Sequence, residues 1–221
     1  MRCGVCGGVN ESDLSLMEYI SNGKSVLDAG CGDGHIMRML MSNGYDVTGV
    51  DIDTTQLEHQ RGIVRGDCNC LPFKNGSFDM VFIVNVLHHV GTPSKLIEEI
   101  SRVLKCRGTM YLSEVTEDNP LLRLARTAHP YWHESDVKSH MKTEEIKSMV
   151  GKRFLRVKED GEIGTIAWVW YVIGEKMMSL DTLETHFLSK LASIIDSIIG
   201  RATDYRFSCQ YNAVEVKKWH S

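Results

Sequence analysis

The chain has 221 residues, of which 43% are hydrophobic and 24% are charged, and its formal net charge is −4. This length corresponds to one domain with room for a small addition, and the composition excludes disordered and fibrous proteins. The small negative charge provides no broad basic field, so we expect no nucleic acid partner. The longest apolar stretch, Ile163 to Gly174, is too short to span a bilayer, so we expect no membrane span.

The first half of the chain alternates strand-like and helix-like segments. Strands are predicted at Ser25–Ala29, Asp46–Val50, Ile63–Arg65, Phe78–Val84 and Thr109–Leu112, with helices at His35–Asn43 and Ser94–Leu104. The near-continuous apolar run of Phe78–Val84 indicates a strand that is buried on both faces. Strands and helices that alternate over short connections predict a parallel sheet with helices on both faces.

The alternation stops after Glu114, and residues 119–141 fit no plain β-α unit. A helix is predicted to restart near Thr143. Two late strands, Phe154–Lys158 and Thr165–Ile173, are predicted to form a hairpin. We therefore divide the chain into an N-terminal segment (1–22), a main domain (23–175) that contains the insertion 119–141, and a C-terminal helix with a tail (176–221).

The clearest helix pattern covers Asp181–Ile199, and its wide apolar stripe needs a partner. We expect this helix to pack on its own domain, or on a second copy of the chain in a homodimer. It carries too few basic residues for a membrane surface.

The seven cysteines lie mostly beside expected strands and turns, and their number is odd. This usage favours a reducing, cytoplasmic setting, and the first residues carry no apolar core of a secretory signal. Cys3 and Cys6 have the spacing of half a zinc knuckle. No second pair supplies the other two ligands of a structural zinc site, so we expect no bound metal.

The most informative stretch is VLDAGCGDG, from Val26 to Gly34. Glycines directly after a buried strand let the backbone turn tightly and approach a ligand, and the next helix offers unpaired N–H groups. Asp51 ends the next strand, 21 residues after Gly30. In an open parallel sheet this places its carboxylate at the same crevice, where it can accept both hydroxyls of a ribose. These residues predict an adenosyl or nucleotide cofactor.

Glycines at 30, 32 and 34 with Asp28 ahead of them resemble motif I of the class I S-adenosylmethionine-dependent methyltransferases, specifically the small type-11-like group. The resemblance continues through VTGVDID, GDCNCLPFKNGSFDMVFIVNVLHHV and SRVLKCRGTMYLSE, and it covers residues 24–114. Four motifs in this order are a specific signal. A dinucleotide-dependent oxidoreductase fits less well, because His35 stands where its fingerprint needs a small residue.

The resemblance implies a Rossmann-like, doubly wound α/β fold: a mostly parallel seven-stranded sheet with a late antiparallel hairpin and helices on both faces. It implies S-adenosylmethionine as the cofactor. The implied cofactor-binding residues are Asp28, Gly30, Cys31, Gly32, Gly34, Asp51, Ile52, Asp67, Cys68 and Asn85.

The family also implies a role for each part of this site. Asp28 and the glycine loop would hold the methionine end, Asp51 the ribose, and Ile52 the face of the adenine ring. Asp67 would accept from the adenine amino group, next to the Cys68 backbone, and Asn85 would lie near the methionine moiety. The alternative is that these carboxylates only cap turns and helices.

The implied reaction is methyl transfer from S-adenosylmethionine to a small-molecule acceptor, with release of S-adenosylhomocysteine. His88 and His89 are the candidate general bases, needed only if the acceptor atom is protonated, and the alternative is that one of them packs under the next helix. NVLHHV replaces the Asn/Asp-Pro-Pro-Tyr/Phe motif of the enzymes that methylate adenine or glutamine, which argues against those acceptors. The sequence leaves open whether the acceptor atom is oxygen, nitrogen, carbon or sulfur.

The insertion 119–141 follows the fifth strand, so it is rooted where ligands bind in such sheets. We predict that it forms a lid over the substrate. Its candidate substrate residues are Arg123, Arg126, His129, Tyr131, Trp132 and His133. A packed helix with the arginines on its solvated face is the alternative. Two other functions remain open: methylation of tRNA or a protein, and cofactor binding without catalysis.

Overall fold

The computed structural model describes residues 25–57, 60–120, 140–162 and 210–218. Its centre is a seven-stranded sheet with the order β3-β2-β1-β4-β5-β7-β6. The strands are β1 (Ser25–Ala29), β2 (Asp46–Asp51), β3 (Ile63–Arg65), β4 (Phe78–Val84), β5 (Leu104–Val115), β6 (Phe154–Glu162) and β7 (Gln210–Lys217). β7 runs antiparallel to both β5 and β6, and the other neighbours are parallel. The predicted mostly parallel α/β sheet is confirmed.

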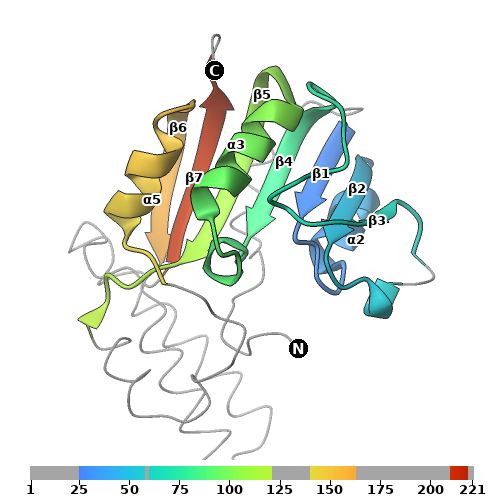
Figure 1. Cartoon of the computed structure of the whole chain (residues 1–221), viewed down its shortest axis with the longest axis horizontal. Helices are drawn as coiled ribbons and strands as arrows, with labels where there is room; N and C mark the ends of the chain where they lie inside the picture. Colours follow the sequence, from blue (N-terminus) through green and yellow to red (C-terminus); the bar gives the residue numbers. More distant parts are fainter. Residues whose placement is uncertain (1–24, 58–59, 121–139, 163–209, 219–221) are drawn as a thin grey trace, which may run out of the picture.

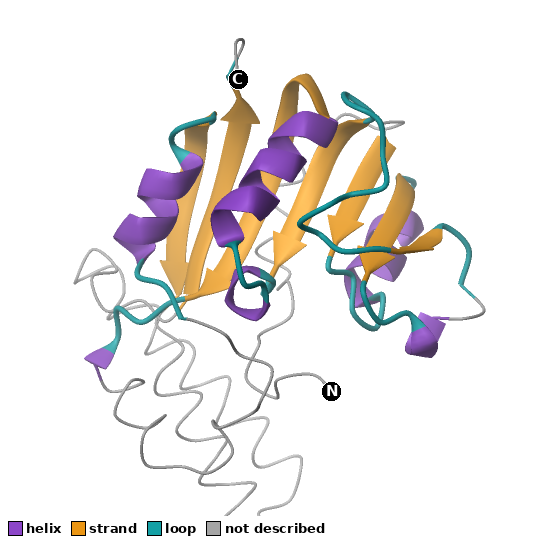
Figure 2. Ribbon diagram, viewed as in Figure 1, coloured by secondary structure: helices purple, strands orange, loops and turns teal. Residues whose placement is uncertain are grey.

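Helices cover both faces of this sheet (Figures 1 and 2). The described helices are α2 (His35–Ser42), α3 (Pro93–Val103) and α5 (Thr143–Val150), with short 3-10 turns η2 (Thr55–Leu57) and η3 (Leu87–His89). α3 and α5 lie on one face, and α2 lies on the other. Among the described helices, none is long and apolar enough to cross a membrane.

Each face of the sheet has its own apolar core, because successive side chains of a strand point to opposite faces. Leu27 of β1 lies in the larger core with Leu96 and Ile100 of α3. Its neighbour Val26 lies in the smaller core with Met37 of α2. Burial on both sides explains why the central strands read as continuous apolar runs rather than as alternating ones.

The late antiparallel part of the sheet is present, and its strand β6 begins at Phe154, as predicted. β6 pairs with β7, with Phe154 opposite Lys217 and Glu162 opposite Gln210. The partner strand that we predicted for β6 is Thr165–Ile173. That segment and the predicted helix 181–199 lie outside the described residues. Residues 210–217 therefore belong to the sheet, although we assigned them to a tail beyond a domain ending at residue 175.

The two ends of the insertion 119–141 lie side by side. Thr116 forms a parallel bridge with Met141, and the N–H of Glu117 donates to the Met141 carbonyl at 3.0 Å. Asp118 accepts the N–H of Thr143, at the start of α5, at 2.9 Å. These contacts hold both ends of the insertion beside the carboxyl end of β5, as a connection rooted at the ligand edge of the sheet requires.

Candidate cofactor site

The glycine loop makes a tight turn between β1 and α2. Gly30, Gly32 and Gly34 all have left-handed φ angles, of 77°, 52° and 74°, which side chains with a Cβ rarely adopt. The N–H of Gly30 donates to the carbonyl of Val50 in β2 at 2.8 Å, so the loop is attached to the neighbouring strand. A Cβ on Gly30 would stand 2.5 Å from the side chain of Val86. The predicted turn is present, and it needs glycine.

Asp28 lies in β1 directly before this loop, and its side chain is 1% exposed. Its Oδ2 atom has no hydrogen-bond partner among the described residues. Burial raises the pKa of this carboxyl group to about 7, opposed by the N–H of Met37 in the first turn of α2 and assisted by the charges of Asp51 and Asp33. A buried polar atom without a partner is costly, so a donor or cation from a ligand would stabilise it.

Asp51, at the end of β2, contacts the same loop. Its Oδ2 accepts the N–H of Gly32 at 2.8 Å, and its Oδ1 accepts the N–H of Asp53 at 3.0 Å. The adjacent side chain of Ile52 is 68% exposed. An apolar side chain left open beside a carboxylate fits a ligand that presents a flat ring next to a pair of hydroxyls.

The third acidic position follows β3. Asp67 is not buried, and its Oδ1 accepts the N–H of Asn69 at 2.8 Å. The N–H of Gly66 donates to the carbonyl of Asp51 at 2.9 Å, which joins this turn to the end of β2. Asp28, Asp51 and Asp67 thus each lie at or directly after the last residues of a strand, on neighbouring strands, as predicted.

Two cysteines accompany these residues. Burial raises the pKa of both Cys31 and Cys68 to about 12, so neither is a thiolate at neutral pH. In a cofactor site, the two cysteines would therefore contribute backbone groups and small apolar side chains. Both are free thiols, as are the exposed Cys70 and Cys106.

The turn after β4 is fixed by a carboxylate that the sequence analysis missed. Asn85 has a left-handed φ of 56°, and its N–H donates to the carbonyl of Ser113 at 2.8 Å. Glu114, 1% exposed, accepts the N–H groups of Val86 and Leu87 at 3.1 and 2.7 Å. An acidic residue inside the apolar run of β5 was the available signal, because such a residue needs buried donors.

The structure separates the two candidate bases. His88 is 1% exposed, and its Nδ1 pairs with the carboxylate of Glu114. His89 is half-buried, with its ring centroid 4.0 Å from that of His88. His140, which precedes α5, also stacks on His88, with its centroid 5.9 Å away. We expected one histidine of the pair to pack inside the protein, and the buried one is His88.

The remaining predictions fall on residues that are not described. Those residues are Cys3, Cys6, Arg123, Arg126, His129, Tyr131, Trp132 and His133. Within the described ranges, no group of three or more His, Cys, Asp or Glu side chains could hold a metal ion.

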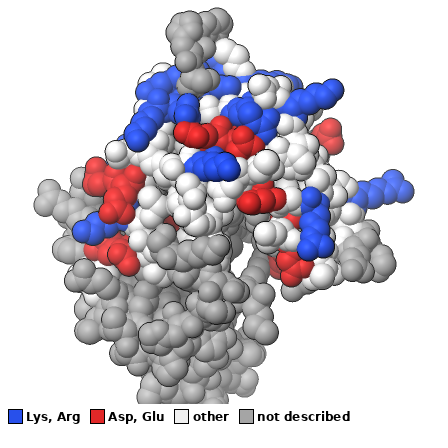
Figure 3. Space-filling model, viewed as in Figure 1, with Lys and Arg blue, Asp and Glu red and all other residues white. Residues whose placement is uncertain are grey.

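Charges of both signs are mixed on the face formed by α3 and α5 (Figure 3). Some of the charges pair across helices: Arg153, just after α5, pairs with Glu98 of α3 at 2.8 Å. The described part of this face therefore presents no continuous field of one sign.

A doubly wound sheet with a glycine loop after β1 and acidic residues after β2 and β3 has the architecture of a class I methyltransferase. Comparison with known families agrees: the family described as a methyltransferase domain matches residues 27–112. The resemblance to the class I, type-11-like S-adenosylmethionine-dependent methyltransferases is thus confirmed. This family and fold imply S-adenosylmethionine as the cofactor. The buried oxygen of Asp28, which has no hydrogen-bond partner among the described residues, and the exposed Ile52 fit it.

Curated relatives carry methyltransferase names. An Encephalitozoon cuniculi protein named as a methyltransferase is 37% identical over 100 residues, which cover 44% of this chain and 48% of that protein. A ubiquinone biosynthesis O-methyltransferase of Bartonella quintana is 26% identical over 176 residues, covering 72% of this chain and 70% of the relative. The chain spans about half the length of most of the curated relatives it matches, the Encephalitozoon protein included.

Solved structures share the fold. An S-adenosylmethionine-dependent methyltransferase of Methanosarcina mazei aligns with a TM-score of 0.63 at 19% identity, covering 92% of this chain and 96% of that one. Another match comes from a complex that contains the Haloferax volcanii Trm112 methyltransferase activator, with a TM-score of 0.62, 20% identity, and 92% and 86% coverage.

Proposed function

We propose that this protein transfers a methyl group from S-adenosylmethionine to a small-molecule acceptor and releases S-adenosylhomocysteine. The observation that carries the proposal is the buried Oδ2 of Asp28, which has no hydrogen-bond partner among the described residues. It lies beside a glycine loop that Asp51 holds through the Gly32 N–H. A structural carboxylate would have its oxygens satisfied by the protein, whereas this one is left for a ligand.

Within this proposal, each residue has one task. Asp28 and the loop Gly30–Gly34 bind the methionine end, and Asp51 binds the ribose hydroxyls. Ile52 covers one face of the adenine ring. Asp67 accepts from the adenine amino group through the oxygen that Asn69 does not use.

Bound S-adenosylmethionine supplies a methyl group that its sulfonium already activates, so the protein mainly orients the acceptor and excludes water. His89 accepts a proton from the acceptor where the acceptor atom is protonated. It is better placed than His88, whose Nδ1 is already paired with Glu114 and whose ring is 1% exposed. His88 and Glu114 instead hold the turn that carries His89.

We assign the acceptor to the small molecules for two reasons. The described charges of the α3 face are mixed, which gives nucleic acid no continuous basic surface there. The names of relatives also include a sterol 4-C-methyltransferase and a ubiquinone biosynthesis O-methyltransferase. The insertion 119–141 stays the proposed substrate segment, and the free cysteines of the described ranges support a reducing, cytoplasmic compartment.

A macromolecular acceptor is the main competing function. The names of relatives include malonyl-[acyl-carrier protein] O-methyltransferases, whose named substrate includes a carrier protein. One structural match lies in a complex with an activator protein, which is a partner of that match and not its methyl acceptor.

Thermal melting with S-adenosylhomocysteine, S-adenosylmethionine and NAD tests the cofactor. A ligand at about a hundred times its Kd stabilises by roughly 2.7 kcal/mol, which raises the Tm by about 5–10 °C for a domain of this size. The two sulfur ligands should raise the Tm and NAD should not. If neither sulfur ligand raises it, the proposal is wrong.

Methyl-labelled cofactor then tests the acceptor. The protein is incubated with a small-metabolite extract, with tRNA and with a protein extract, and the label is followed by size. Label in the small-molecule fraction supports the proposal. Label confined to RNA or protein would replace it with the competing function.

A further inference from the structure

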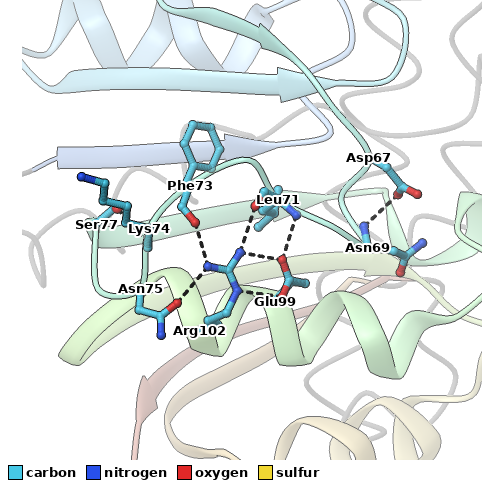
Figure 4. A network of polar contacts seen from close by, with 9 residues as sticks. All are labelled: Asp67, Asn69, Leu71, Phe73, Lys74, Asn75, Ser77, Glu99 and Arg102. Carbon is cyan, nitrogen blue, oxygen red and sulfur yellow. Dashed lines mark hydrogen bonds and ion pairs between the residues drawn. The ribbon is translucent and has the colours of Figure 1, made fainter.

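The loop between β3 and β4, which contains Asp67, is attached to α3 by one arginine (Figure 4). Arg102 donates to the carbonyls of Leu71 and Phe73, at 2.9 and 2.7 Å, and to Oδ1 of Asn75 at 3.0 Å. The planar guanidinium thus contacts three residues of the loop at once, which a lysine could not do with the same geometry.

Glu99, one turn earlier on α3, completes this clamp. Both of its oxygens accept from Arg102, at 2.8 and 2.7 Å, and Oε2 also accepts the N–H of Leu71 at 2.8 Å. The hydrogen bond from Arg102 holds the pKa of Glu99 below its usual value. Leu71 is therefore held at both its N–H and its carbonyl by one ion pair.

The clamped residue follows the Asp67 turn closely. The N–H of Cys70 donates to the Asp67 carbonyl at 2.8 Å, and the N–H of Asn69 donates to Asp67 Oδ1 at 2.8 Å. This turn has Gly66, bonded to β2, on one side and Leu71, bonded to α3, on the other. Asp67 itself is not buried, so packing does not hold its side chain in place. The hydrogen bonds of the turn therefore determine where its second carboxylate oxygen lies.

We propose that Glu99 and Arg102 form a positioning pair that sets the selectivity of the site for an adenine amino group. They do so by holding the turn that carries Asp67. The inference rests on the proposed function, since it takes Asp67 as the acceptor for that amino group. A carboxylate accepts from an amino group and repels a carbonyl oxygen, so selectivity falls when the carboxylate is free to move.

The test compares two ligands that differ at the 6-position of the base and, with it, in whether N1 carries a hydrogen. S-adenosylhomocysteine carries the amino group, and S-inosylhomocysteine carries a carbonyl oxygen there. Their Kd values are measured by titration calorimetry on the full chain. The wild type should prefer the adenosyl ligand by about tenfold or more, the range of one hydrogen bond to a charged group.

Arg102→Lys keeps the positive charge and removes the planar fork. We expect its Kd ratio to fall to about threefold or less, mostly through weaker binding of the adenosyl ligand. Glu99→Gln keeps the shape of the side chain and should lower the ratio in the same direction, which provides a second variant if the first does not fold.

Arg153→Lys is the matched control. Arg153 pairs with Glu98, also on α3, at 2.8 Å, and this pair holds α3 without reaching across to the Asp67 loop. The ratio of its Kd values for the two ligands should equal that of the wild type. A double variant of Asp67→Asn with Arg102→Lys should show no further loss of ratio beyond Asp67→Asn alone, because both changes act on one contact.

The outcomes are distinct. An Arg102→Lys variant that binds both ligands more weakly by the same factor overturns the inference, because the pair would then only support the fold. A wild type that binds S-adenosylhomocysteine without preference overturns it too and leaves the proposed function standing. A wild type that binds neither ligand refutes the proposed function and the inference together.

Discussion

Asp28→Asn tests whether the buried carboxyl group makes the ligand-free protein less stable at neutral pH. The pKa of this group in the folded protein is about 7, against an ordinary value of 3.8 for aspartate. Between these values the folded protein holds a proton that the unfolded chain has released. A group whose pKa is higher in the folded protein than in the unfolded chain stabilises the fold fully at pH values below its unfolded pKa. That stabilisation is lost as the pH rises through its folded pKa.

The magnitude follows from the width of this window. Each pH unit inside it changes the free energy of unfolding by about 1.4 kcal/mol. From about pH 5 to pH 7 the wild type should therefore lose roughly 2 kcal/mol from this group alone, because the group is already half ionised at pH 7. The Asp28→Asn side chain has no proton to release, so the variant should gain that amount relative to the wild type over the same interval.

Urea unfolding of the ligand-free protein at several pH values measures the difference. Asp53→Asn is the control: a hydrogen bond from the Thr55 N–H lowers the pKa of this exposed residue, so it titrates below the window. Equal pH slopes for the wild type and Asp28→Asn would refute the reasoning. Because the methionine end of the ligand carries an ammonium group, S-adenosylhomocysteine should also bind the wild type more tightly as the pH rises through 7.

Further variants test the other parts of the site. Asp51→Ala should weaken S-adenosylhomocysteine binding by about 2 kcal/mol, measured by calorimetry, since two ribose hydroxyls lose a charged acceptor; unchanged affinity would exclude the ribose assignment. His88→Ala should cost about 3 kcal/mol of stability by stranding a buried partner, whereas His89→Ala should lower turnover and leave the affinity for the cofactor unchanged; the reverse pattern would exchange their roles. Gly30→Ala should destabilise the fold by more than Gly44→Ala, whose Cβ would meet nothing within 4 Å, and equal melting temperatures would contradict the Val86 clash.

The sequence was sufficient for the parallel half of the sheet. β1, β3 and β4 have the predicted bounds, Ser25–Ala29, Ile63–Arg65 and Phe78–Val84. For β1 and β4 the reason is that a strand buried on both faces requires an apolar run that can be read locally. The acidic residues at the cofactor edge were predictable for a related reason. Each one lies at the end of its own strand or directly after it, and parallel strands bring those ends together.

β7 could not be predicted in this way, because its apolar pattern is interrupted. Asn212 and Glu215 are both buried in it, and such residues argue against a central strand when only the sequence is known. Glu215 is paired with Arg156 of β6 at 3.2 Å, so its charge is met by a residue far away in the chain. The hydrogen bonds from Arg102 to the Asp67 loop also join residues that are far apart in the chain, so the sequence could not predict them either.

Asp28 and Glu114 show why a buried carboxylate can be read as structural or functional only from its contacts. Both are 1% exposed, and each lies near the carboxyl end of a central strand. Glu114 binds two N–H groups and His88, so the protein itself satisfies both of its oxygens. Asp28, at the same depth, keeps one oxygen that has no hydrogen-bond partner among the described residues. Since burying such an oxygen costs free energy that folding alone does not recover, its place beside the glycine loop is best explained by a ligand donor.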